Sequence, residues 1–360
     1  MKNTFGNSVS VTIFGESHGA YIGCVIDGLP AGLEIDHSFI SRQLDKRRPA
    51  GSISTSRTEQ DRFQIISGVF DGRTCGTPLT VIIPNSDTRS KDYDYGKARP
   101  GHADYTAFKR YNGFEDYRGG GHFSGRVTAA LTAAGAVAIQ ILLKKGVSIA
   151  THISECAGIS DRSFDDFKKD FDKLDNTDFA ALDDTAAQKM KDAIVCAKND
   201  GDSVGGILET VIMGMPAGVG DPWFDSVEGM LSHAVFSVPA VKGVEFGDGF
   251  AIAKMRASAA NDPFVIKNGN VVTTKNSNGG INGGITNGMP IVMRTAIKPT
   301  PTIFKPQQTV DFKSRQNTVI SAKGRHDPCI VHRARTVVDS VCALTVVDLL
   351  ASRFGADWLR

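Results

Sequence analysis

Three short segments bounded by glycine or proline each carry a histidine, and two of them also carry arginine and aspartate. They are residues 15–19 (GESHG, with His18), 99–104 (RPGHAD, with Arg99, His102 and Asp104) and 324–328 (GRHDP, with Arg325 and Asp327). Glycine and proline predict loops at these positions. Histidine titrates near neutral pH and a carboxylate accepts protons, so one pocket built from the three loops would combine proton transfer with anion binding.

The sequence over 99–126 predicts a cationic, glycine-rich loop that leads into an apolar helix. It contains six glycines, three of them consecutive at 119–121, and is too rich in glycine for a stable helix. Because glycine has no Cβ, backbone N–H groups there can approach a ligand closely, and the start of the next helix adds positive potential. The stretch therefore predicts an anion site.

Two further segments add donors suited to phosphate or carboxylate. Lys46, Arg47 and Arg48 end a helix predicted over 36–47, and residues 298–302 (KPTPT) follow a strand pattern. Arginine binds such anions through two parallel hydrogen bonds. The arginines also have a purely structural explanation, because cations at the end of a helix complement its dipole.

Composition excludes several classes of function. The 360-residue chain has a net charge of +2, too small for a dedicated nucleic-acid-binding protein. Its six cysteines are scattered without a CxxC pair, which indicates reduced thiols and a cytoplasmic location. The N-terminal residues lack the apolar core of a signal peptide, and the longest apolar stretch, 129–143, is short for a membrane span. We therefore expect a buried helix there and no membrane partner.

Neither a metal site nor a nucleotide fingerprint is expected. His102 with Asp104, and His326 with Asp327, have metal-ligating side chains at short spacing, but arginines stand beside both pairs and their charge opposes cation binding. The sequence contains no Walker A motif and no GxGxxG.

The chain repeats itself, which predicts two related halves. Residues 15–32 and 201–218 align without a gap at an offset of 186, with nine identities in 18 positions. A weaker echo relates 67–81 to 279–293 at an offset of 212. We place the halves at about 5–150 and about 200–355, joined by a charged surface segment at about 160–200. In the alignment His18 faces Val204, so the halves differ where an imidazole stands in one of them.

The predicted elements form a layered fold. Apolar runs rich in β-branched residues predict strands, and the patterns over 127–145 and 335–354 predict two fully buried helices. We therefore predict the α/β (α+β) class, with one domain over residues 1–360. It is a β-α-β sandwich with two pseudo-symmetric halves and buried central helices.

Four motifs resemble the chorismate synthase family, in its bacterial and monofunctional type, over about residues 5–354. They are GESHG at 15–19, RPGHADYT at 99–106, DYRGGG at 116–121 and GRHDPC at 324–329. The resemblance implies a β-α-β sandwich that assembles as a homotetramer. It also implies a 1,4-anti elimination of phosphate from 5-enolpyruvylshikimate 3-phosphate, giving chorismate with reduced FMN and no net redox change.

The resemblance also implies roles for individual residues. His18 would protonate the departing phosphate, His102 would lie beside the flavin, and Asp327 would help to remove the proton from ring carbon 6. The residues implied to bind substrate are Ser17, Arg47, Arg48, Arg99, Arg126 and Arg325. Those implied to bind FMN are His122, Phe123, Ser124, Pro239, Ala240, Gly283, Lys298, Pro299, Thr300, Pro301, Thr302 and Arg325.

The chain departs from the family in one run. Many members have Arg-Ser-Ser-Ala-Arg after the glycines; Ser124 and Arg126 match it, whereas His122 and Phe123 replace its first Arg and a Ser. Because no dinucleotide fingerprint is present, NADPH is expected to act only indirectly, through an outside flavin reductant. Two other functions stay open from the residues alone: a non-catalytic binder of anions or flavin nucleotides, and a metal-dependent phosphohydrolase.

Overall fold

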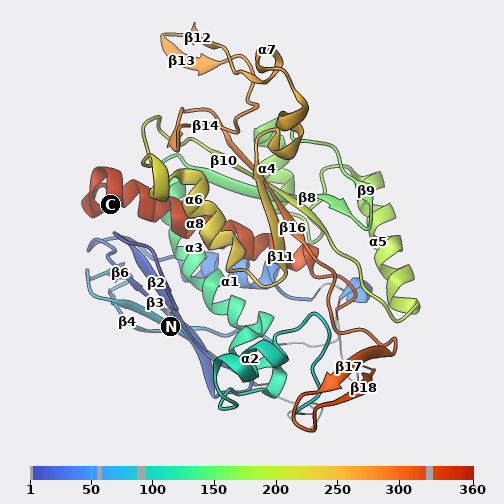
Figure 1. Cartoon of the computed structure of the whole chain (residues 1–360). Helices are drawn as coiled ribbons and strands as arrows, with labels where there is room; N and C mark the ends of the chain where they lie inside the picture. The colour runs from blue at the N-terminus through green and yellow to red at the C-terminus, as the bar shows by residue number, and fades with distance from the viewer. Residues whose placement is uncertain (1–2, 50, 55–58, 87–94, 322–326) are drawn as a thin grey trace.

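Two antiparallel five-stranded sheets enclose a layer of helices (Figure 1). The computed structural model describes residues 3–49, 51–54, 59–86, 95–321 and 327–360. The first sheet has the order β1 (Thr4–Phe5), β2 (Ser10–Gly15), β3 (Tyr21–Asp27), β7 (Leu79–Pro84), β4 (Gln64–Ser67). The second has the order β11 (Val241–Phe246), β16 (Ile291–Ile297), β10 (Gly206–Met213), β8 (Ser148–Cys156), β9 (Ile159–Ser160).

The central layer contains α3 (Thr128–Lys144) and α8 (Val331–Phe354), flanked by α1 (His37–Lys46) and α6 (Val227–Phe236). Helix α3 packs on β3 and β7, α8 packs on β8 and β10, and the two helices pack on each other. The predicted fold class, with its two buried central helices, is confirmed. Helix α8 begins four residues earlier than the pattern indicated, just after Pro328 and Cys329.

Close contact between the central helices depends on a glycine. A Cβ on Gly135 of α3 would lie 2.2 Å from Cβ of Ser340 in α8. Residues 125–144 are long and apolar enough to pass a length-and-composition test for a membrane span, yet 78% of the tested window is buried inside the protein. This helix therefore forms the core, as expected.

The two sheets repeat one another in order and in detail. Strands β2, β3, β7 and β4 of the first sheet have the same order as β8, β10, β16 and β11 of the second, whereas the edge strands β1 and β9 differ in their place along the chain. The Thr74 hydroxyl accepts from Leu33 N at 2.9 Å and donates to Pro30 O at 2.6 Å. The Thr286 hydroxyl does the same with Val219 N at 3.0 Å and Pro216 O at 2.6 Å. Val219 and Pro216 follow Leu33 and Pro30 by the offset of 186 residues, so the repeat in the sequence is also a repeat in the structure.

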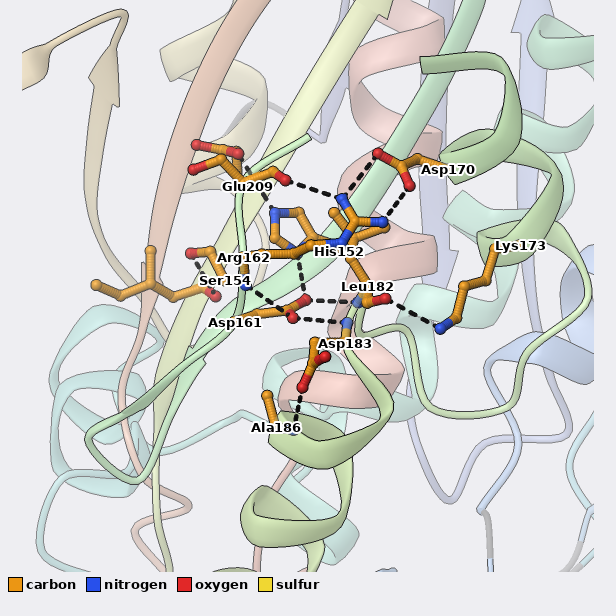
Figure 2. Close-up of polar contacts among 12 residues, drawn as sticks. His152, Ser154, Asp161, Arg162, Asp170, Lys173, Leu182, Asp183, Ala186 and Glu209 are labelled. Carbon is orange, nitrogen blue, oxygen red and sulfur yellow. Dashed lines mark hydrogen bonds and ion pairs between the residues drawn. The ribbon is translucent and has the colours of Figure 1, made fainter. Parts of the chain in front are cut away.

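The charged segment between the halves is not purely a solvated surface. It forms α4 (Phe167–Asp175) and α5 (Asp184–Asn199), next to β8 and β9. Figure 2 shows His152 of β8 between two carboxylates, with Nδ1 2.9 Å from Asp161 and Nε2 3.3 Å from Glu209. Asp161 also accepts from Leu182 N at 2.5 Å and Asp183 N at 2.8 Å. The expectation of surface charge is wrong for Asp161, whose side chain is fully buried.

The His152 cluster predicts a stability that falls as pH rises. Burial alone lowers the pKa of His152, but the hydrogen bonds that its ring donates to Asp161 and Glu209 more than offset this effect and raise the pKa above 6.5. The stabilisation is therefore complete below about pH 6.5 and is lost as pH rises through the raised pKa. We expect His152→Gln to lower the free energy of unfolding most at acidic pH.

Urea unfolding of the wild type and of His152→Gln, from about pH 5.5 to about pH 9, measures this difference. His37→Gln, on the exposed first residue of α1, is the control for loss of a histidine outside this cluster. A pH-independent difference for His152→Gln would contradict the assignment.

Candidate active site

The predicted histidine loops converge where the first sheet ends and the central helices begin. The turn at residues 16–20 joins β2 to β3, residues 98–127 precede α3, and residues 327–330 precede α8. Ser17 N donates to Gly121 O at 3.0 Å, which ties the first loop to the second. Val204 N donates to Pro328 O at 2.9 Å, which ties the second half of the chain to the third loop. Arg325 and His326 lie outside the described residues.

The three consecutive glycines separate the two described histidines of the site. A Cβ on Gly119 would lie 2.6 Å from the His18 ring, and a Cβ on Gly120 would lie 3.2 Å from Cε1 of His102. Both glycines, with φ of 61° and 83°, occupy the left-handed region that other residues avoid. Only glycine therefore lets both imidazoles lie against the same stretch of backbone. Ser17 is fully buried beside His18, and its hydroxyl has no partner among the described residues.

His102 is held by an aspartate and an arginine from its own loop. Its Nδ1 lies 3.0 Å from Asp104 Oδ1 and 3.1 Å from Arg99 Nη2. Arg99 also donates to Asp104 through Nε at 2.9 Å and Nη2 at 2.7 Å. Burial opposes ionisation of Asp104, but these hydrogen bonds hold its pKa well below 3.8. The carboxylate thus orients the ring and leaves Nε2 on the side of Gly120.

A buried carboxylate joins two of the predicted anion-binding arginines. Asp61 accepts from Arg47 Nη2 at 2.6 Å and from Arg126 Nη1, and all three side chains are less than 10% exposed. Burial opposes ionisation of Asp61, but the two arginines lower its pKa below the ordinary value. Burial also lowers the pKa of Arg47, and its Nε has no partner among the described residues. Arg47 therefore keeps a donor for a ligand.

Arg126, which is predicted to bind substrate, has several protein partners. Its Nε donates to Asn85 Oδ1 at 2.8 Å and lies 3.0 Å from Glu59 Oε2, and its Nη2 donates to Pro84 O at 3.1 Å. With Nη1 on Asp61, every nitrogen of the guanidinium has a protein partner. Arg126 therefore holds the protein framework of the site. Arg48 lies at the rim, paired with Asp45 at 2.6 Å and 37% exposed.

The predicted base Asp327 is held by the first turn of α8. Arg333 Nη1 lies 2.6 Å from Asp327 Oδ2, and Arg333 Nε donates to the carbonyl of Arg47 at 2.9 Å. This arginine was not predicted from the sequence, although it stands four residues after the GRHDPC motif. Arg333 therefore connects the third loop to Arg47.

The KPTPT segment lies against the His102 loop. Lys298 Nζ donates to Gly101 O, and a Cβ on Gly101 would lie 3.1 Å from Pro301 Cβ. Lys298 N donates to Ala240 O at 3.0 Å, which brings the 239–240 pair to the same place. The Thr300 carbonyl accepts from Ser203 at 2.7 Å, whereas its buried hydroxyl has no partner among the described residues.

Two of the residues predicted to bind the cofactor, His122 and Phe123, directly follow the three glycines. A third, Gly283, lies in another part of the fold. His122 Nδ1 contacts Gly15 O at 2.7 Å, and Phe123 is 39% exposed with its ring 6.1 Å from Tyr111. Gly283 is in the turn between β14 (Ile281–Asn282) and β15 (Ile285–Thr286). Lys298 follows the other end of β16, about 20 Å along the strand. Within a single chain, Gly283 therefore lies away from the other predicted site residues.

The arrangement suits an anionic ligand that undergoes proton transfer. The N-termini of α3 and α8, where the helix dipole is positive, both face the cluster through the residues that precede them. The loop cluster combines the His18 and His102 rings, the carboxylates of Asp61, Asp104 and Asp327, and several guanidinium groups. Among the described residues, no three His, Cys, Asp or Glu side chains gather as metal ligands do.

Comparisons with known proteins identify the family. The family model described as chorismate synthase matches residues 9–351. The chorismate synthase of Archaeoglobus fulgidus is 47% identical over 350 residues, 97% of each chain. That of Methanosarcina acetivorans is 46% identical over 98% of this chain and 97% of the relative. Both relatives are archaeal, so they do not support the bacterial type expected from the sequence.

The fold has a counterpart among solved structures. A crystal structure of chorismate synthase superimposes with a TM-score of 0.78 at 27% identity, covering 97% of this chain and 94% of that chain.

The Asp104 cluster yields a stability prediction with a matched control. Asp104→Asn leaves the half-buried Arg99 without its carboxylate, and we expect a loss of about 2 kcal/mol in the free energy of unfolding at neutral pH. Because the folded pKa of Asp104 is depressed, this contribution is present above pH 3.8 and is lost as pH falls through the folded pKa.

Chemical denaturation of both forms from neutral pH down to about pH 3 tests this prediction. Asp116→Asn is the control, because Asp116 pairs with the more exposed Arg118 at 2.8 Å and should contribute about 1 kcal/mol or less. An equal loss from both variants would contradict the role given to Asp104.

Proposed function

The chain belongs to the chorismate synthase family, and on that premise we propose that the loop cluster described above eliminates phosphate from 5-enolpyruvylshikimate 3-phosphate. The chain is a carbon–oxygen lyase of the shikimate pathway. The observation that carries the assignment of the site is the convergence of His18 and His102 on one glycine backbone. Asp61 joins Arg47 to Arg126, which follows the glycines in the chain, and Arg333 joins Asp327 to the carbonyl of Arg47.

The residues present fit a bound reduced FMN. The Ser17 and Thr300 hydroxyls are buried without partners among the described residues, and any Cβ at Gly119 or Gly120 would fill the space beside the imidazoles. Lys298 and the 299–302 backbone suit a phosphate, and His102, Ser124 and Ala240 border the same region. When bound, reduced FMN would supply a transient electron that weakens the carbon–oxygen bond to phosphate.

The chain's own residues would bind the substrate and move its protons. Arg47 donates to an anionic group, and Arg99 adds positive charge beside it. His18 Nε2 or Nδ1 delivers a proton to the departing phosphate, and the Asp327 carboxylate, held by Arg333, takes part in removing the proton from ring carbon 6. His18 and Asp327 lie on different loops, so separate groups would carry out the two proton transfers.

We also propose the supply of the cofactor and the setting of the enzyme. The chain has no fingerprint for a dinucleotide, so NADPH would act through a separate flavin reductant, and the enzyme would be monofunctional. A cytoplasmic location would place it with that reductant. All six cysteines are free thiols in the structure, which supports a reducing compartment.

Anaerobic turnover with chemically reduced FMN and the enolpyruvyl substrate, followed by chorismate absorbance, tests the function. His102→Ala and Asp327→Ala should each lower turnover by at least about 10²-fold, the usual scale for proton-transfer groups. His37→Ala, on the exposed start of α1, should leave turnover unchanged. NADPH alone, without a reductase, should give no turnover.

The outcomes separate the remaining functions. FMN binding by the folded wild type without product would indicate a non-catalytic flavin binder. Phosphate release that needs a metal ion and stops with a chelator would indicate a phosphohydrolase. Unchanged turnover in either site variant would remove that residue from the mechanism.

A homotetramer belongs to the same proposal, and an exposed apolar surface supports it. The hairpin of β12 (Phe264–Lys267) and β13 (Asn270–Thr273) projects from the body of the protein (Figure 1). Ile266 is 71% exposed, and Trp223, Phe224 and Phe250 are each more than 80% exposed. Apolar surface of this extent is typical of protein–protein interfaces.

Light scattering on the purified protein should give about four times the chain mass of 38.5 kDa. Ile266→Glu places a charge on this surface and should lower the measured mass. Val319→Glu, on the separate hairpin of β17 (Gln307–Asp311) and β18 (Gln316–Ile320), is the control, because Val319 is 50% exposed and also lies on a hairpin. A monomeric wild type would contradict the proposal.

A further inference from the structure

Asn85, at the end of β7, contacts the turn that carries His18. Its Nδ2 donates to Glu16 O at 3.0 Å and to Gly19 O at 2.8 Å, and its backbone N donates to Ala20 O at 3.1 Å. Its Oδ1 accepts from Arg126 Nε at 2.8 Å. We propose that Asn85 is a positioning residue for His18. This inference rests on the proposed function of His18 as the proton donor.

The orientation of the Asn85 amide is determined by its partners. A guanidinium only donates hydrogen bonds and a backbone carbonyl only accepts them. Oδ1 must therefore face Arg126, and Nδ2 must face the two carbonyls. A flipped amide would lose all three hydrogen bonds, so this side chain has one stable orientation.

Arg126 is in turn held in place by buried groups. Its side chain is 3% exposed, and Asp61, which accepts from Nη1, also accepts from Arg47. Arg47, Asp61, Arg126 and Asn85 therefore form one continuous chain of hydrogen bonds. It runs from the arginine that has a donor for the substrate anion to the turn that carries the proton donor.

The turn itself is short and half-buried, and it depends on such contacts. Within it, Gly19 N donates to Glu16 O at 3.0 Å, so this carbonyl accepts from both Gly19 and Asn85. A further contact comes from the glycine side, where Ser17 N donates to Gly121 O. Removing the Asn85 side-chain amide leaves the Glu16 and Gly19 carbonyls without that donor, whereas the backbone hydrogen bond from Asn85 N to Ala20 O remains. His18 would then be misplaced while Arg47 and Asp61 stay paired.

Two variants separate the parts of the Asn85 contact. Asn85→Asp keeps an acceptor for Arg126 but turns a second oxygen toward the Glu16 and Gly19 carbonyls. Asn85→Ala removes both contacts and leaves a smaller side chain at a half-buried site. We expect each variant to lower kcat by about 10²-fold, because a displacement of about 1 Å has effects of that size. KM should change by less than about threefold, because Arg47 is untouched.

The matched control is Asn276→Asp. Asn276 Nδ2 also donates to a backbone carbonyl, that of Pro290 at 2.8 Å, but in the second half of the chain. It should lower stability to a similar degree and leave kcat unchanged. A second readout does not depend on turnover: the ring resonances of isotope-labelled His18, assigned with His18→Gln, should shift in both Asn85 variants and not in Asn276→Asp.

The results decide the proposal in every case. Unchanged kcat with an unshifted His18 resonance would overturn it, as would an equal fall of kcat in Asn276→Asp. A fall in kcat that is matched by a large rise in KM would assign Asn85 to anion binding instead. If the wild type binds FMN but forms no chorismate, the proposed function fails, and the His18 resonance still tests the positioning role.

Discussion

The carboxylate of Asp61, buried between Arg47 and Arg126, is the interaction on which the rest of the site depends. Without it, Arg47 and Arg126 would each lose a buried ion-pair partner, which is highly unfavourable in the protein interior. With it, the end of α1, the residues before α3 and, through Asn85, the His18 turn are joined in one framework. Arg333 extends the framework to Asp327 through the carbonyl of Arg47. His18 and Asp327, the proposed proton donor and base, are therefore both connected to the buried pair of Arg47 and Asp61.

The glycine run complements that framework on the ligand side. Gly119, Gly120 and Gly121 have φ between 53° and 83°, and side chains at these positions would collide with His18, His102 or the Asp116 carbonyl. The backbone there takes the place that a side chain would otherwise occupy. Its N–H groups and the positive ends of two buried helices create an environment for anions without further charged side chains.

The two halves of the chain show how a repeated scaffold gives one site. Ser17 and Ser203 are equivalent in the repeat, yet the Ser203 hydroxyl donates to Thr300 O, whereas the Ser17 hydroxyl has no partner among the described residues. His18 is likewise replaced by Val204, whose N–H holds the third loop through Pro328. At these two positions the first half has an imidazole and a buried hydroxyl, whereas the second half has groups that bind its own backbone.

The sequence by itself determined the types of secondary-structure element and the residues that are able to take part in chemistry. The repeat, the strands, the buried helices and the three histidine loops all follow from local patterns of apolar, glycine and charged residues. Tertiary structure decided the partners of each charged group. Arg47 and Arg126 are alike in sequence, but Nε of Arg47 has no partner among the described residues, whereas each nitrogen of the Arg126 guanidinium has one in Asp61, Asn85 or Pro84. Asp61, Asn85 and Arg333 belong to no motif, and Gly283, which only the resemblance implied, lies away from the other predicted site residues. Hydrogen-bond partners far apart along the chain are set by packing, which no local pattern records.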